Sequence, residues 1–288
     1  MTFADALRSG RALLMDGAMG TELIRRGYAG PTWRANLEAP ELVATIHAEY
    51  AAAGAEVVLT NTFMMAEADS PQQIGTAAVA LARRTGRWVL GSLATSSRRA
   101  DDPNVEKILA CVRSLTAVDG VLLETCSDRH AFTIAHAISK EFSALPVLIS
   151  FAFAPGESEK MIRLARAADA SAIAALGVNC GREQSAADIW QTLDLFRGAT
   201  RKPLFARPNA GSPQRADGRW TYPLNPGDWA LATAQLCDRG LAMIGGCCGT
   251  TPQFIGELSR LVTSSNERRK DPSPLLGASG KRAADDNP

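Results

Sequence analysis

The chain has 288 residues, of which 46% are hydrophobic, and a formal net charge of +1. This length and composition suit a globular protein with a large core, and a charge near zero gives no reason to expect nucleic acid or an anionic membrane as a partner. No apolar run approaches the roughly 18 residues that a membrane span needs, and the first residues lack the apolar stretch of a secretory signal. We therefore expect a cytoplasmic protein, in which the six cysteines are thiols and not a disulfide framework.

Short apolar runs alternate with longer helical segments eight times along the chain. The runs predict strands buried on both faces of a parallel sheet: Ala12–Met15, Glu56–Thr60, Trp88–Ser92, Gly120–Glu124, Pro146–Phe151, Ala172–Val178, Pro203–Ala206 and Ala242–Gly245. The segments between and after them predict helices: Pro40–Ala53, Pro71–Thr85, Asn104–Val118, Asp128–Phe142, Glu157–Ala170, Glu183–Phe196, Pro226–Arg239 and Pro252–Val262. Eight such units predict a closed (β/α)8 TIM barrel, with an open doubly wound sheet as the alternative.

The end of the chain differs from the rest. Residues 264–288 read SSNERRKDPSPLLGASGKRAADDNP, a polar segment rich in proline, serine, glycine and charge. Such a composition cannot bury enough apolar surface to fold alone. We therefore expect a barrel over residues 1–263 and a disordered tail over 264–288, with a docking peptide for a partner as the alternative reading of the tail.

Three cysteines follow two of the predicted strands. Cys180 ends the stretch GVNC after the sixth strand, and Cys247 and Cys248 stand in GGCCGT after the eighth. Because a barrel carries its active site in the loops after its strands, these thiols are expected to meet. Three thiolates suit a tetrahedral zinc ion and leave its fourth position open, which is the catalytic arrangement. The alternatives are buried small side chains or a reactive dithiol.

The remaining cysteines and the histidines give weaker signals. Cys111 and Cys237 fall inside predicted helices and are expected to be packing residues, and packing is also favoured for Cys126, just beyond the fourth strand. The three histidines, all in predicted helices, are expected to be structural: His47, His130 and His136.

Two acidic residues stand at the same end of the predicted barrel. Asp16 follows the first strand beside a glycine-rich turn, and Glu124 ends the fourth strand. Two carboxylates at the mouth of a nearly neutral barrel could bind the ammonium group of an amino acid. The alternative is that each caps a loop or a helix. Glu22, by contrast, is expected to be an early residue of a helix.

Several segments together resemble the homocysteine S-methyltransferase family, which includes betaine–homocysteine methyltransferase and the homocysteine module of cobalamin-dependent methionine synthase. The matching segments run in order across nearly the whole barrel: LLMDGAMGTELIRRG at 13–27, PELVATIHAEYAAAGAEVVLTNTF at 40–63, LLET at 122–125, GVNC at 177–180, RPNAG at 207–211 and IGGCCGTTPQFI at 244–255. The pairing of GVNC with GGCCGTTP is the most specific of these signals.

The resemblance implies a TIM barrel with Zn²⁺ held by Cys180, Cys247 and Cys248. In the family, the sulfur of homocysteine binds the zinc, and no catalytic residue is expected beyond this zinc-bound thiolate of the substrate. By similarity, the substrate amino group would be held by Asp16 and Glu124, with further contacts nearby from Gly17, Thr62 and Trp33.

The implied reaction transfers a methyl group to the thiol of homocysteine and gives methionine. The expected partners are homocysteine and a small-molecule donor such as S-methylmethionine, S-adenosylmethionine or betaine, or a separate protein that carries methylcobalamin or folate. The chain departs from the family after the third strand, where residues 91–107 read GSLATSSRRADDPNVEK, short and without aromatics. This departure leaves the donor open. It also motivates an alternative, in which the chain is a zinc-binding barrel that has lost catalysis and acts as a regulatory or complex subunit.

Overall fold

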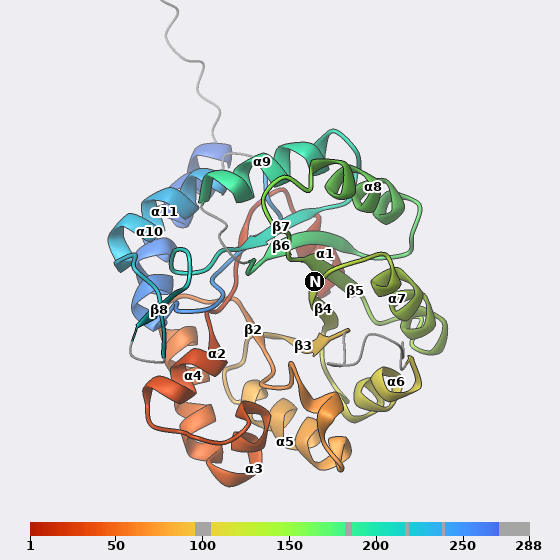
Figure 1. The fold of residues 1–288 in the computed structure, drawn as a ribbon, viewed down its shortest axis with the longest axis vertical. Helices are drawn as coiled ribbons and strands as arrows, with labels where there is room; N and C mark the ends of the chain where they lie inside the picture. Colours follow the sequence, from red (N-terminus) through yellow and green to blue (C-terminus); the bar gives the residue numbers. More distant parts are fainter. Residues whose placement is uncertain (96–104, 182–185, 217–218, 238–239, 271–288) are drawn as a thin grey trace, which may run out of the picture.

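The computed structural model describes residues 1–95, 105–181, 186–216, 219–237 and 240–270. Its described part contains an eight-stranded parallel sheet in the order β1-β10-β7-β6-β5-β4-β3-β2, ringed by helices (Figure 1). The sheet closes where the Asp16 N–H donates to the Val57 carbonyl oxygen at 2.9 Å and the Glu56 N–H to that of Leu14 at 2.7 Å. The predicted (β/α)8 barrel is confirmed. Its strands are β1 (Leu13–Leu14), β2 (Val57–Leu59), β3 (Trp88–Ala94), β4 (Gly120–Cys126), β5 (Val147–Phe151), β6 (Ala175–Asn179), β7 (Leu204–Arg207) and β10 (Met243–Ile244).

Each predicted helix has a counterpart in the barrel. These are α4 (Pro40–Ala52), α5 (Pro71–Arg83), α6 (Val105–Ser114), α7 (His130–Glu141), α8 (Ser158–Asp169), α9 (Ala186–Arg197), α10 (Pro226–Cys237) and α11 (Pro252–Lys270). The sequence patterns did not predict a short helix α1 (Phe3–Leu7), α3 (Ala35–Glu38), two 3-10 segments η1 (Thr32–Arg34) and η2 (Met65–Glu67), or a hairpin of β8 (Gln214–Ala216) and β9 (Arg219–Thr221). Glu22 lies in α2 (Met19–Arg25), as its position suggested.

The apolar core has two layers. One lies between the strands and the surrounding helices, where α4 contributes Val43, Ile46 and Tyr50. The other fills the inside of the barrel with side chains that alternate with the first set along each strand. Helix α1 packs Phe3 and Leu7 against this inner layer, and it lies across the centre of the ring in Figure 1. Packing therefore fills the amino-terminal end of the barrel, and polar side chains gather at the opposite end.

Helix α11 runs past the predicted end of the barrel. It continues to Lys270, and the Asn266 side chain exchanges two hydrogen bonds of 3.0 Å with the backbone of Ala12. The boundary predicted at residue 263 thus falls inside this helix. Residues 271–288 of the predicted tail and residues 96–104 of the loop after β3 lie outside the described residues. None of the helices described is both long and apolar enough to cross a membrane.

Candidate active site and metal centre

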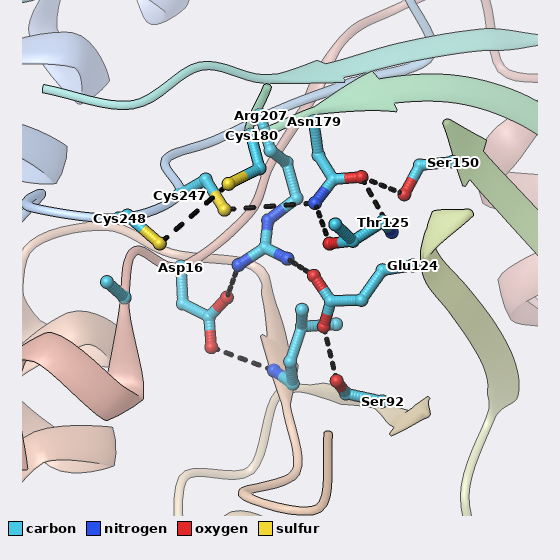
Figure 2. Close-up of polar contacts among 12 residues, drawn as sticks. Asp16, Ser92, Glu124, Thr125, Ser150, Asn179, Cys180, Arg207, Cys247 and Cys248 are labelled. Carbon is cyan, nitrogen blue, oxygen red and sulfur yellow. Dashed lines mark hydrogen bonds and ion pairs between the residues drawn. The ribbon is translucent and has the colours of Figure 1, made fainter. Parts of the chain in front are cut away.

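The three cysteines singled out in the sequence come together at the carboxyl ends of the strands. Cys180 follows β6, and Cys247 and Cys248 follow β10, which is separated from β6 in the sheet by β7. Their sulfur atoms all lie within 4.8 Å of one another, and those of Cys180 and Cys248 are 4.0 Å apart (Figure 2). Sulfurs bound tetrahedrally to zinc at about 2.3 Å would be roughly 3.8 Å apart. The spacing therefore fits one zinc ion with a free fourth position.

Unusual backbone conformations bring the thiols to this point. Cys180 has a φ of 52°, followed by Gly181 at 94°, so the chain turns through the left-handed region just beyond β6. Before the cysteine pair, a Cβ on Gly246 would lie 2.3 Å from the Thr250 hydroxyl oxygen. Only glycine fits there, because the Thr250 side chain packs directly on this turn and donates to the Cys247 carbonyl at 2.7 Å.

The thiols influence one another strongly. Hydrogen bonds from Cys247 and Cys248 lower the pKa of Cys180 to about 3. The pKa of Cys247 is raised to about 11, chiefly by its bond to Cys180, and that of Cys248 is raised as well. Without a cation, Cys180 therefore ionises, and its negative charge keeps Cys247 and Cys248 protonated. A bound divalent cation removes this conflict, because all three ligands can then ionise.

Asn179 links the thiols to the neighbouring strands. Its buried side-chain oxygen accepts hydrogen bonds from the Ser150 hydroxyl at 2.7 Å and the Thr125 N–H at 3.0 Å. Its amide nitrogen donates to the Thr125 hydroxyl at 2.9 Å and contacts the Cys247 sulfur at 3.8 Å (Figure 2). The ends of β4, β5 and β6 are thus fixed around the cysteines.

A buried cluster of three charged residues lies beside the thiols. Arg207, at the end of β7, donates to a Glu124 carboxylate oxygen at 2.9 Å, and its other terminal nitrogen lies 3.6 Å from Asp16 Oδ1 (Figure 2). Asp16 Oδ2 accepts the Leu59 N–H at 2.8 Å, and the Ser92 hydroxyl donates to Glu124. Among the described residues, Asp16 Oδ1 has no hydrogen-bond partner.

Burial dominates the electrostatics of this cluster. Desolvation raises the pKa of Asp16 to about 7, although Arg207 and the Leu59 N–H oppose the shift. It also raises the pKa of Glu124. For Arg207, burial opposes the charged form, but the two carboxylates outweigh it and raise its pKa. With two carboxylates and one guanidinium, the fully ionised cluster carries one excess negative charge, which a ligand ammonium group would neutralise.

A cavity of about 340 Å³ connects the thiols with the charged cluster. Four of the predicted substrate-binding residues line it together with the three cysteines: Asp16, Gly17, Thr62 and Glu124. The Thr62 hydroxyl donates to the Ser92 carbonyl at 2.7 Å, so its hydrogen bond joins the segment after β2 to β3. Trp33 is not among the described residues that line this cavity; it is buried in η1, and its neighbour Thr32 reaches the wall.

Sequence reasoning did not assign a role to Arg207, Asn179 or Ser92. A usable signal existed for Arg207, because it ends the apolar run LFAR of a strand buried on both faces. A buried guanidinium must find carboxylate partners, and Asp16 and Glu124 were the acidic residues expected at the same rim. The other two are ordinary polar residues whose partners depend on the register between strands.

The other cysteines lie outside this cluster. Cys111, Cys126 and Cys237 are buried, and burial raises the pKa of Cys126 to about 12. His47 is fully buried in α4 with neither ring nitrogen bonded to a described residue. Histidine does not occur among the described residues that line the cavity.

Comparison with known proteins assigns the chain to a family. Residues 13–262 match the homocysteine S-methyltransferase family. Methionine synthases of Mycobacterium leprae and Mycobacterium tuberculosis are each 30% identical over 304 residues, which cover 89% of this chain and 25% of theirs. The chain thus spans about a quarter of their length. Homocysteine S-methyltransferase 2 of Zea mays is 25% identical over 92% of this chain and 94% of its own.

Solved structures show the same fold. The homocysteine methyltransferase MmuM of Escherichia coli aligns in its apo form with a TM-score of 0.71 and 24% identity, over 88% of this chain and 97% of that one. Its metallated form aligns with a TM-score of 0.68 and 23% identity, over 89% and 98%. The extent of the family match confirms the resemblance in the sequence: the chain belongs to the homocysteine S-methyltransferase family.

Proposed function

We propose that this protein is a zinc-dependent methyltransferase that moves a methyl group from a donor to the thiol of homocysteine and produces methionine. The observation that carries the proposal is the cavity that joins the three thiols to the buried cluster of Asp16, Glu124 and Arg207. Its two ends match the two ends of homocysteine, a thiol and an ammonium group. The names of the mycobacterial and maize relatives support the same reaction.

The charged cluster would bind the amino acid part of the substrate. Asp16 Oδ1 is a buried acceptor without a hydrogen-bond partner among the described residues, so the substrate ammonium can bond to it without displacing a protein donor. Arg207 holds Asp16 and Glu124 at the same rim and limits their mutual repulsion. This binding fixes the reacting sulfur near the cysteines, and such positioning contributes much of the rate of a two-substrate reaction.

The three cysteines would hold the zinc ion. When bound, zinc lowers the pKa of a coordinated substrate thiol, so that the thiolate needed as nucleophile is present at neutral pH. Because the described lining contains no histidine, the thiol proton would leave to water. The chain itself then orients the sulfur and keeps it in a largely buried pocket.

The methyl donor is a small molecule in this proposal. A separate cobalamin or folate protein is the other source, because the methionine synthases that match are about four times as long as the aligned region. The two sources can be told apart only by offering both.

Metal analysis tests the site. Protein purified under reducing conditions should hold about one zinc per chain, and Cys247→Ala and Cys248→Ala should each lose it. Cys111→Ala is the matched control, because this cysteine is buried in α6 outside the cluster; it should keep its zinc. Zinc-free wild-type protein, or zinc retained in both site variants, would exclude the metal centre.

A donor panel tests the reaction. Homocysteine should be offered with S-methylmethionine, S-adenosylmethionine, betaine and methylcobalamin in parallel, and methionine formation measured. At least one donor should give methionine in the zinc-loaded protein and none in Cys248→Ala. If the zinc-loaded protein forms methionine from no donor, the chain is a non-catalytic zinc-binding barrel.

A further inference from the structure

A second cavity lies at the amino ends of the strands, at the opposite end of the barrel from the thiols. Its volume is about 320 Å³, and none of the described residues that line it also lines the cavity at the thiols. The wall is formed by the segments that lead into β1, β7 and β10, and β10 lies between the other two strands in the sheet. A cavity of this size suits a small molecule.

The wall of this amino-end cavity is strongly basic. Five of its described lining residues carry a positive charge, and no aspartate or glutamate occurs among them. The cations are Arg8, Arg11, Arg197, Arg201 and Lys202. They come from segments far apart in the sequence, and only the closed barrel brings them together. Because like charges repel one another, such a wall is unfavourable until carboxylates or a bound anion neutralise it.

Two of the five cations are engaged by other parts of the protein. Arg11 forms an ion pair with Glu56 at 2.7 Å, so its charge is neutralised. The ammonium of Lys202 donates to the Ser171 carbonyl at 2.7 Å, which fixes this side chain but leaves its charge in place.

Asp169 offsets the charge of the loop before β7 only in part. Its pKa is lowered chiefly by the hydrogen bond from the Arg201 N–H at 2.8 Å and then by the Thr200 hydroxyl at 3.1 Å, and the charges of Lys202 and Arg201 contribute less. The carboxylate is thus bonded to the loop itself, and the Arg201 guanidinium stays available to a ligand.

Three arginines of the wall form no ion pair within the part of the chain that the structure describes: Arg8, Arg197 and Arg201. Asp5 interacts with Arg8, but its carboxylate already accepts the Thr2 hydroxyl at 2.7 Å. The Arg197 guanidinium reaches the segment before β10, since a Cβ on Gly240 would lie 3.7 Å from its Nη1. Arg197 also ends α9, where a cation stabilises the helix, whereas Arg201 lies in the loop beyond that helix.

We propose that the amino-end cavity binds the phosphate groups of a small soluble molecule through Arg8, Arg197 and Arg201. The planar guanidinium matches two phosphate oxygens at once. A phosphate monoester carries nearly two negative charges and three acceptor oxygens, so it neutralises several arginines, whereas a carboxylate offers one charge and two oxygens. This site does not depend on the proposed methyl transfer, because it lies at the other end of the barrel.

Calorimetry with inorganic pyrophosphate tests the site without homocysteine or a methyl donor. Potassium chloride keeps the ionic strength constant, so that general screening does not differ between samples. Pyrophosphate should bind with a Kd below about 1 mM, orthophosphate more weakly, and acetate at least about tenfold more weakly than pyrophosphate. At ten times its Kd, pyrophosphate should raise the unfolding temperature by about 3 °C.

Variants of the unpaired arginines locate the binding. Arg197→Gln and Arg201→Gln should each weaken pyrophosphate about 3- to 10-fold, and Arg201→Lys should recover part of the affinity because it keeps the charge. Arg163→Gln is the matched control, an exposed arginine of α8 that does not line the cavity; it should bind like the wild type. Without an anion, Arg201→Gln should unfold at or above the wild-type temperature, because one of several like charges is gone.

Two further samples exclude other sources of the signal. Cys248→Ala should bind pyrophosphate like the wild type, and binding lost in this variant would place the anion on the metal and overturn the site. Vesicles that contain phosphatidic acid should not retain the protein; retention that pyrophosphate does not reverse would mean a membrane surface in place of a soluble ligand. Equal binding of pyrophosphate and acetate would also overturn the proposal. So would Arg197→Gln and Arg201→Gln variants that unfold several degrees lower but bind pyrophosphate normally, since these arginines would then serve the fold alone. None of these results bears on the proposed function.

Discussion

Arg207 is the residue on which the polar end of the barrel depends. It is 3% exposed and faces two carboxylates, each also less than 10% exposed. A buried charge is tolerated when it is paired, whereas an unpaired one carries the full cost of its lost hydration. The arginine therefore favours the ionised forms of Asp16 and Glu124 and opposes the rise in their pKa values that burial causes.

Removal of this arginine should destabilise the protein strongly. Arg207→Met leaves two buried carboxylates without their cation, so we expect a loss of about 3–5 kcal/mol in the free energy of unfolding, measured by urea denaturation at pH 7.5. Arg163→Met is the control, because Arg163 is 69% exposed and its ion pair at 3.6 Å is with the still more exposed Glu159; it should change stability by less than about 0.5 kcal/mol. Equal stability of the two variants would show that Arg207 does not hold the cluster.

Asp16 should make ligand binding depend on pH. Burial raises its pKa to about 7, so the carboxylate that would bind an ammonium group forms as the pH rises through 7. Methionine has this ammonium group but no titrating thiol. Its affinity for the zinc-loaded protein should therefore increase about 25-fold between pH 5.5 and 7.5, in proportion to the ionised fraction of Asp16, measured by calorimetry.

The variant Asp16→Asn should bind methionine weakly and with little pH dependence. Asp69→Asn, at an exposed loop position, should follow the wild type. The same raised pKa affects stability with the opposite sign. The folded state holds the proton more tightly than the unfolded one, so the contribution of Asp16 to stability falls as the pH rises from about 4 to about 7 and is constant above. If the affinity of Asp16→Asn for methionine changed with pH as it does in the wild type, Asp16 would not be the group that makes binding depend on pH.

At the scale of elements, helix α4 places His47 in the apolar core, where its side chain is neutral. His47 is fully buried beside Ile46 and Tyr50, and burial lowers its pKa to about 4 from the usual 6.5. Between these two pH values the unfolded state binds the proton and the folded state does not. Stability therefore decreases as the pH falls through this range.

Replacing His47 should remove this acid sensitivity. The free energy of unfolding of His47→Leu, relative to the wild type, should be about 2 kcal/mol higher at pH 5 than at pH 7.5, measured by denaturation at both pH values. His136→Leu, an exposed position of α7, should show no such change. A pH-independent difference for His47→Leu would mean that the ring takes up its proton in the folded state.

The elements of the barrel could be predicted because each one is an apolar run or an amphipathic helix of its own. The hairpin β8–β9 was missed, although Asp217-Gly218 between its strands is a hairpin signal, because its exposed strands carry no apolar pattern. The extra turns of α11 were missed because residues 264–270 are polar, and their helix continues from an apolar segment with Asn266 anchored on Ala12.

At the scale of the whole molecule, the site combines segments that no local pattern connects. The convergence of the three cysteines could be predicted because they follow two predicted strands of one barrel and are flanked by glycines. The second cavity could not, because its wall joins the segments before β1, β7 and β10, and their approach depends on the closure of the barrel. A cluster of one residue type, such as these cysteines, can be predicted from the sequence. A pocket whose wall comes from several loops can be found only once the fold is known.

The same closure should make zinc a stabiliser of the entire barrel. The three cysteines that would hold it follow β6 and β10, on either side of β7, and they meet only when the sheet is closed. A ligand that binds only the folded state stabilises it by about 4 kcal/mol at a thousandfold excess over its Kd. The unfolding temperature in buffered free zinc should therefore rise by several degrees over the value in a chelator. The control Cys248→Ala should unfold at one temperature in both solutions, and Cys111→Ala should respond like the wild type. An unfolding temperature of the wild type that is independent of zinc would mean that the cysteines hold no metal that spans the strands.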